Sequence, residues 1–148
     1  MPQFGKMSVQ NLAQAHPDLQ VLFNTEIKYY DCTVSDSYRT KEKQEEYFNK
    51  GLSKVHYPTC HNTKPSNAVD VYPFEINKVD YDLMQCLHFA GFVMGIANML
   101  YDQGLMKHRI RNGGDWDKDN DINDNPFEDP GHFEIIPLGG EQFQYFEV

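Results

Sequence analysis

Apolar residues recur at helical spacing over the N-terminal part of the chain. Ser8 is a suitable N-cap for a short helix running to about Ala15, because a serine side chain can accept a hydrogen bond from an unpaired backbone N–H. A second helix is predicted over residues 16–30, since its apolar side chains fall on one face. That face would be formed by Leu19, Leu22 and Ile27.

Two further helices are predicted along the chain. Thr40 is a suitable N-cap for a polar helix over residues 41–50, and Gly51 is a suitable C-cap. The longest helix is predicted from about Asp80 to Gln103, because apolar residues recur there at helical spacing and a glycine follows. Its apolar side would be formed by Leu83, Leu87, Ala90, Met94, Ala97 and Tyr101.

Short runs rich in β-branched and aromatic residues predict strands between and after these helices. They are CTV at 32–34, NAVDVYPF at 67–74 with an end at Pro73, HRIRNGG at 108–114 and HFEII at 132–136. Residues 52–66 and the acidic stretch 115–131 predict loops, because turn-forming and polar residues dominate both. Helices followed by short strands around one long helix indicate an α+β fold, with a small, mostly antiparallel sheet packed with helices.

Length and composition indicate one domain. The chain has 148 residues, of which 40% are apolar and 14% aromatic, and this is sufficient for one core. No internal repeat or Pro- or Gly-rich linker interrupts it, so we expect a single domain over 1–148 with no separate binding module. An odd number of cysteines without tight spacing predicts free thiols at Cys32, Cys60 and Cys86.

The charge balance excludes several classes of partner. Asp and Glu number 22 against 13 Lys and Arg, and the formal net charge is −9. Such a surface argues against nucleic acid and against docking on anionic lipid, because both require basic residues. The N-terminus lacks the apolar stretch of a signal peptide, and no apolar run approaches the roughly 20 residues of a membrane span. We therefore expect no membrane insertion.

Two segments carry residues that suit a metal ion with an open coordination position. TCHNTKPSNAVDVYP offers His61 and Asp70, and EDPGHFEII offers His132 at the start of a strand. Catalytic zinc usually takes three such ligands and leaves a fourth position to water, whose pKa the metal lowers toward neutrality. From the residues alone His61 has equal competitors as a ligand, namely His56, His88 and His108.

The acidic loop suggests a second metal site. Oxygen-bearing side chains occupy positions 1, 3, 5, 7, 9 and 12 of a twelve-residue stretch, which is the spacing of an EF-hand calcium loop. They are Asp117, Asp119, Asp121, Asn123, Asn125 and Glu128. Position 6 is Ile122 where glycine is expected, and no helical pattern lies on both flanks, so a solvated acidic loop without a cation is the alternative.

Several motifs in order resemble the M15 zinc peptidases. They are SDSYRT with KEKQEEYFNKGLSK, then TCHNTKPSNAVDVYP, then GGDWD and EDPGHFEI, over roughly residues 8–137. The chain is most similar to the phage L-alanyl-D-glutamate endopeptidases among them. The resemblance implies the α+β fold of hedgehog-like and D-Ala-D-Ala peptidase domains. One departure is Asn112, where relatives often carry an aromatic residue before GGDW.

The resemblance assigns roles residue by residue. It implies that His61, Asp70 and His132 are the zinc ligands and that Asp129 is the catalytic acid/base. It also implies that Arg39 holds a carboxylate or carbonyl of the substrate. Glu134 follows His132 by two positions, and either orients that ligand or is exposed.

The implied activity is zinc-dependent cleavage between L-Ala and D-Glu of the peptidoglycan stem peptide, for host lysis by an endolysin. Alternatives are a D-Ala-D-Ala carboxypeptidase or dipeptidase of wall remodelling, and a metal- or wall-binding module without turnover. The missing signal peptide favours the endolysin. It would stay in the host cytoplasm until a holin-made hole opens the way to the periplasm and wall. We expect a monomer without a cell-wall-binding domain.

Overall fold

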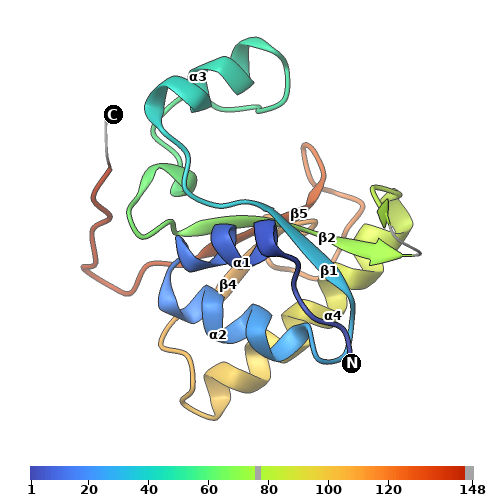
Figure 1. Ribbon diagram of the computed structural model, residues 1–148. Coiled ribbons are helices and arrows are strands. Elements are labelled where there is room, and N and C mark those ends of the chain that lie inside the picture. The colour runs from blue at the N-terminus through green and yellow to red at the C-terminus, as the bar shows by residue number, and fades with distance from the viewer. Residues whose placement is uncertain (76–77, 146–148) are drawn as a thin grey trace.

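The computed structural model describes residues 1–75 and 78–145, which form an α+β domain (Figure 1). The helices are α1 Lys6–Ala13, α2 Pro17–Glu26, α3 Lys41–Asn49, the short 3₁₀ helix η1 Cys60–Asn62, and α4 Leu83–Asp102. The strands are β1 Cys32–Asp36, β2 Ala68–Glu75, β3 Lys78–Val79, β4 Ile110–Gly113 and β5 Asp129–Ile135. The predicted fold class is confirmed.

All strand pairs in the sheet are antiparallel, in the order β1-β2-β5-β4, with β3 added to β2. The pairing of β2 with β5 sets Asp70 directly opposite His132. Residues that are distant in the sequence therefore meet at the centre of the sheet. Because successive side chains of a strand point to opposite faces, this register also fixes what lies on each face.

One face of the sheet carries the hydrophobic core. Figure 1 shows α2 and α4 packed on that side, with α3 on the other side. The ring of Phe133 on β5 lies edge-on to Phe23 of α2 and to Phe89 of α4, with centroids 5.3 and 6.3 Å away. All three rings are fully buried. Because side chains alternate along a strand, His132 and Glu134, the neighbours of Phe133 on β5, face the opposite side of the sheet.

The N-terminal helices differ from the prediction at their ends. α1 begins at Lys6 after an N-cap at Gly5, so Ser8 is an internal helix residue and not the cap. The Ser8 hydroxyl instead accepts a hydrogen bond from the backbone N–H of Val34 at 3.0 Å, which attaches α1 to β1. α2 ends at Glu26, four residues before the predicted end at residue 30.

The buried stripe of the long helix α4 overlaps the predicted one only in part, at Ala90 and Ala97. Leu83 is 47% exposed, whereas the buried positions are Cys86, Phe89, Ala90, Val93, Ile96, Ala97 and Leu100. Apolar residues occupy more than one side of this helix, so periodicity alone does not select the core face.

By length and composition α4 is also apolar enough to cross a membrane, and the expectation that no apolar run approaches the length of a membrane span was wrong. Phe89 and Val93 nevertheless lie in the core.

The helix α3 forms as predicted. Thr40 Oγ1 accepts a hydrogen bond from the backbone N–H of Lys43 at 3.1 Å, and Gly51 adopts a φ of +74° just after the helix. Glycine suits this conformation because it has no Cβ. The strand predicted to end at Pro73 instead continues to Glu75, and the strand predicted at HFEII begins earlier, at Asp129.

A buried carboxyl group lies in the core at the end of α2. Glu26 is inaccessible to solvent, and its Oε2 accepts a hydrogen bond from the thiol of Cys32 at 3.0 Å. Burial raises the pKa of Glu26 to about 8, and the nearby charge of Asp31 acts in the same direction. Glu26 is therefore mostly protonated at neutral pH in the folded chain.

Stability should consequently fall as the pH rises toward the folded pKa of Glu26. The pKa is raised on folding, so its contribution is complete below the unfolded value and is lost as the pH rises through about 8. Glu26→Gln removes this titration and should gain stability relative to the parent chain by roughly 1.4 kcal/mol per pH unit between the two pKa values. Urea denaturation across that range measures it, with the exposed Glu42→Gln as control. If the free energy of unfolding changed with pH equally in the parent chain and in Glu26→Gln, the raised pKa would not belong to Glu26.

Candidate metal centre and active-site cleft

A cleft of about 680 Å³ opens on the face of the sheet opposite the core. Its floor is formed by side chains of β2 and β5, including Asp70, Tyr72 and His132. Its walls come from the loop after α3 and from the acidic loop before β5. His61, Asp70 and His132, the candidate metal ligands, all line this cleft.

His61, Asp70 and His132, the ligand set that the resemblance implied, lie together in the cleft, and their role as ligands stays a prediction. His61 Nε2 and His132 Nδ1 each lie 3.3 Å from Asp70 Oδ1. One donor atom from each residue falls within 4.8 Å of the others. His61 is placed by η1, Asp70 by β2 and His132 by β5, so the set depends on the β2–β5 register.

The outer nitrogen of each histidine is fixed by a hydrogen bond. His61 Nδ1 donates to the backbone carbonyl of Ser37 at 2.6 Å, and His132 Nε2 donates to Glu134 Oε1 at 2.8 Å. A neutral imidazole that donates through one nitrogen carries its lone pair on the other. The inner nitrogens, His61 Nε2 and His132 Nδ1, both face Asp70 Oδ1, and each offers a lone pair there once it carries no proton. This arrangement of two nitrogen donors and one carboxylate oxygen, with oriented outer nitrogens, fits a divalent metal ion.

The charges of the centre favour cation binding. Burial alone would raise the pKa of Asp70, but the charge of His61 and hydrogen bonds from both histidines hold it well below its usual range. Burial lowers the pKa of His132, but hydrogen bonds to Asp70 and Glu134 outweigh it and raise the value to about 10. Without a metal, both ring nitrogens of His132 therefore carry a proton at neutral pH. A metal must displace that proton, so its affinity should rise with pH.

Glu134 orients His132 and is itself held in place, which decides between the alternatives left open by the sequence. It is buried, and its Oε2 accepts a hydrogen bond from Arg111 Nη2 at 2.9 Å. Cys60 Sγ also lies 3.6 Å from this oxygen. The charges of His132 and Arg111 outweigh the effect of burial and lower the pKa of Glu134. The Glu134 carboxylate therefore stays ionised and holds the outer nitrogen of His132 by a hydrogen bond.

Arg39 lies behind Asp70 at the cleft wall. Its Nη2 is 3.2 Å from Asp70 Oδ2, and its Nε and Nη2 also donate to Asp36 Oδ2. Its Nη1 donates to Gln44 Oε1 at 2.7 Å, and its guanidinium lies over the ring of Tyr47. Arg39 therefore positions the second oxygen of Asp70 and leaves Oδ1 to the histidines. Its predicted contact with substrate stays a prediction.

Asp129 lies at the start of β5 and lines the cleft. Burial and the nearby charge of Asp70 raise the pKa of Asp129 from its ordinary value. A raised pKa is what a group that accepts and returns a proton requires. The backbone at this point is close to Gly113, where an added Cβ would lie 2.1 Å from the Asp129 carbonyl oxygen. Only glycine fits there.

Tyr72 is a cleft residue that the sequence reasoning missed. It lies two positions after Asp70 on β2 and so shares the same face of the sheet. Its ring covers Gly131, where an added Cβ would approach the ring atoms to 2.4 Å. Burial and the charges of Asp70 and Asp129 raise the pKa of Tyr72, so its hydroxyl keeps its proton. The period-two alternation along β2 was the signal that could have found it.

Asn112, the departure from the family pattern, braces β5. Its Nδ2 donates to the carbonyls of Pro130 and His132 at 2.8 and 2.9 Å, and its Oδ1 accepts from the N–H of Gly114. Trp116 lies beside it on the cleft wall, with its ring 5.5 Å from that of His132. The Trp116 Nε1 donates to the carbonyl of Phe127, which fixes the acidic loop.

The acidic loop gathers a different set from the EF-hand spacing. Asp117 and Asp119 group with Asp115, which was not among the predicted calcium ligands. The side-chain oxygen of Asn125 is already engaged within the protein, since Asn125 Oδ1 accepts a hydrogen bond from the backbone N–H of Trp116 at 2.8 Å. Asp121 and Asn123 bond to each other, and Glu128 lines the cleft. The loop thus has a candidate cation group, but not in the predicted register.

The other candidate histidines lie away from the centre. His56 Nδ1 pairs with Glu45 at 2.8 Å, and His88 lies next to the hydroxyl of Tyr30. His108 belongs to a separate cluster with Asp18. The tertiary structure therefore selects His61 from the competitors that spacing left equal.

Known L-alanyl-D-glutamate peptidases are similar to this chain over most of its length. The family model described as phage L-alanyl-D-glutamate peptidase matches residues 1–136. An L-alanyl-D-glutamate peptidase of Escherichia phage T5 is 25% identical over 139 residues, covering 90% of this chain and 98% of that protein. The crystal structure of the Serratia marcescens L-Ala D-Glu endopeptidase ChiX has the same fold, with a TM-score of 0.68, 22% identity and 90% of each chain covered.

Replacing Glu134 by Gln should weaken metal binding without unfolding the chain. The amide keeps the size of the side chain but loses the charge that holds His132 in orientation, and such outer partners typically contribute 10- to 100-fold in metal affinity, so we expect a loss of about that size. Competition with a chromophoric chelator measures it, and Glu42→Gln on the exposed face of α3 is the matched control. Equal affinity in all three proteins would show that Glu134 does not support the ligand.

Proposed function

The chain belongs to the phage L-alanyl-D-glutamate peptidase family, and from this premise we propose that it is a zinc-dependent endolysin. Its substrate is the peptidoglycan stem peptide, and the bond it cleaves joins L-Ala to D-Glu. The observation that carries the proposal is the convergence of His61 Nε2, Asp70 Oδ1 and His132 Nδ1 in an open cleft.

Zinc is the metal whose preferences match these donors. Two imidazole nitrogens and one carboxylate oxygen, with room for a further ligand, form the usual donor set of a catalytic zinc site. His61, Asp70 and His132 would hold the ion. When bound, zinc supplies Lewis-acid polarisation of the scissile carbonyl and activation of water.

The residues of the chain supply proton transfer and orientation. Asp129 accepts a proton from the attacking water and passes it to the leaving nitrogen, which its raised pKa allows. Arg39 and Glu134 hold Asp70 and His132 from behind, so the donor atoms need little rearrangement. Arg111 lines the cleft with a partly exposed guanidinium. Together with Arg39 it offers positive charge to the carboxylates of the stem peptide.

The biological setting that we propose is host lysis. The protein acts as a monomer, remains in the host cytoplasm until a holin opens the membrane, and then reaches the wall. A carboxypeptidase of wall remodelling is less well supported, because the family match favours an L-alanyl-D-glutamate peptidase. A binding module without turnover is less well supported, because Asp129 offers a proton-transfer group beside the centre.

We further propose that a calcium ion orders the acidic loop and so positions Asp129. Desolvation and the charges of Asp119, Asp117 and Asp121 raise the pKa of Asp124, which shows that the carboxylates of this loop repel one another. A cation would relieve that repulsion. Because Glu128 immediately precedes Asp129 on the cleft wall, ordering of the loop would reach the active site.

Mass spectrometry of purified muropeptides tests the main proposal. Incubation with the zinc-loaded protein should release a peptide that begins at D-Glu, and a chelator should abolish this. Asp129→Asn should lower turnover by about 10²- to 10⁴-fold while zinc stays bound. Asp102→Asn, at an exposed position at the end of α4, is the matched control and should retain full activity.

Three outcomes of that experiment would contradict the proposal. Loss of terminal D-Ala alone would identify a carboxypeptidase. No cleavage by protein with zinc bound would identify a binding module. Full activity of Asp129→Asn would remove Asp129 from the mechanism and leave the zinc centre in place.

Calcium should raise the turnover of the calcium-stripped, zinc-loaded enzyme. The rise should be lost in a variant with both Asp117→Asn and Asp119→Asn, because these two carboxylates belong to the group whose oxygen atoms lie within 4.8 Å of one another. Steady-state cleavage of muropeptides with and without added calcium measures this. Identical rates in the parent enzyme under both conditions would rule out a regulatory calcium ion.

A further inference from the structure

The lysine and arginine side chains that line the cleft differ in how freely they can bind a substrate. In the described part of the chain they are Arg39, Lys54 and Arg111. Arg39 is only 7% exposed, and its Nε, Nη1 and Nη2 all donate to carboxylate or amide oxygens of the protein. Its guanidinium is therefore already engaged. Lys54 lies in the loop after α3, outside any helix or strand.

Arg111 is held firmly but keeps donors for a ligand. It lies on β4, paired with Glu134 of β5, and its Nη2 donates to Glu134 Oε2 at 2.9 Å. The guanidinium carbon lies 5.2 Å from the centre of the Trp116 ring, and the side chain is 38% exposed. Arginine has five N–H donors, and Nη2 is the nitrogen that bonds to a described residue. Arg111 thus presents a fixed, planar fork that suits a carboxylate.

The sheet register places Arg111 on the side of the cleft where the leaving group emerges. Gly113 of β4 is paired with Asp129, and Arg111 with Glu134. Adjacent strands lie about 5 Å apart, so Arg111 is within the length of one amino-acid residue of the centre. In the proposed mechanism Asp129 passes its proton to the leaving nitrogen, which therefore lies toward β4. The residue that carries this nitrogen then extends along Arg111.

We propose that Arg111 is a specificity-determining residue, which binds the free carboxylate of the D-Glu residue on the amine side of the scissile bond. This inference rests on the proposed function. D-Glu has two carboxyl groups and uses one to join the next residue of the stem peptide, so the other stays charged beside the scissile bond. The N–H groups that Glu134 does not occupy bind this carboxylate. Glu134 and Trp116 hold the guanidinium in place.

The alternative is a purely structural role, in which Arg111 only holds Glu134 behind His132. A structural role affects all substrates equally, because they share one metal centre. Recognition of a carboxylate affects only the substrates that carry it. The two roles therefore differ in the ratio of kcat/KM for a peptide with the free D-Glu carboxylate to kcat/KM for the same peptide with a carboxamide there.

Cleavage of these two synthetic peptides by the zinc-loaded full chain tests the proposal. The parent enzyme should prefer the free acid by about 10- to 100-fold in kcat/KM, and Arg111→Gln should lose this preference. Arg111→Lys should keep part of it, because the charge remains but the fork is lost. Arg109→Gln is the matched control and should keep all of it, since the Arg109 guanidinium lies over the ring of Tyr101 in the last turn of α4.

Three results would overturn the proposal. One is a parent enzyme that cleaves both peptides equally well. Another is an unchanged preference in Arg111→Gln, and a fall of both rates together would assign Arg111 to the support of Glu134. The third is loss of the preference in Lys54→Gln with its retention in Arg111→Gln, which would assign the carboxylate to the loop after α3.

Binding measurements separate this proposal from the proposed function. Isothermal titration calorimetry of both peptides with zinc-loaded Asp129→Asn reports the preference without turnover. The free acid should bind about 10-fold more tightly or better, and adding Arg111→Gln should remove the difference. Cleavage of neither peptide by the parent chain, with this binding preference present, would contradict the peptidase alone. Equal binding of both peptides would contradict the role of Arg111.

Discussion

The antiparallel pairing of β2 with β5 is the constraint on which the rest of the structure depends. It places Asp70 opposite His132 and buries Phe133 on the other face, against Phe23 and Phe89. Because side chains alternate along a strand, the core and the metal centre are fixed by the same register. A shift by one residue would exchange the two faces, so hydrophobic burial itself protects the position of the ligands.

Each of the three candidate ligands in the cleft is held from behind by a different part of the chain. The carbonyl of Ser37 fixes His61, Arg39 fixes Asp70, and Glu134 fixes His132. A buried polar group without such a partner is costly, so these contacts both satisfy the buried groups and set their orientation. The centre is therefore organised before any metal or substrate binds, and preorganisation of this kind is what a hydrolytic site requires.

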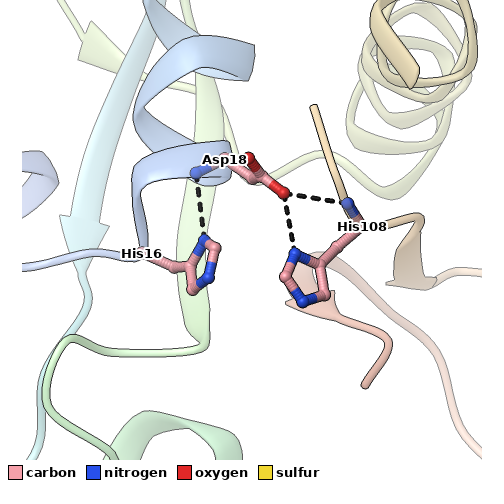
Figure 2. Close-up of side chains that lie close together, drawn as sticks. All are labelled: His16, Asp18 and His108. Atoms are coloured by element: carbon pink, nitrogen blue, oxygen red, sulfur yellow. Dashed lines mark hydrogen bonds and ion pairs between the residues drawn. The ribbon is translucent and has the colours of Figure 1, made fainter. Parts of the chain in front are cut away.

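A second histidine–aspartate group, formed by His16, Asp18 and His108, holds segments of the chain together through hydrogen bonds and ion pairs (Figure 2). Asp18 joins the start of α2 to the backbone before β4, and Glu141 joins the C-terminal segment to His108. Both groups combine an aspartate, an inner imidazole nitrogen and an outer carboxylate. They differ in surroundings, since the first lies on the floor of an open cleft and the second braces three segments against one another.

The sequence by itself determined the fold class, the cap at Thr40 and the approximate positions of the strands, because local patterns of capping and alternation specify them. A resemblance carried by ordered motifs supplied the set His61, Asp70 and His132, which spacing alone left among equal competitors. The tertiary structure decided which face of α4 is buried, that Arg39 supports Asp70, and that Asp115 joins the acidic group. These features depend on contacts between residues distant in the chain. Local sequence carries no record of such contacts, because the sheet register and helix packing create them.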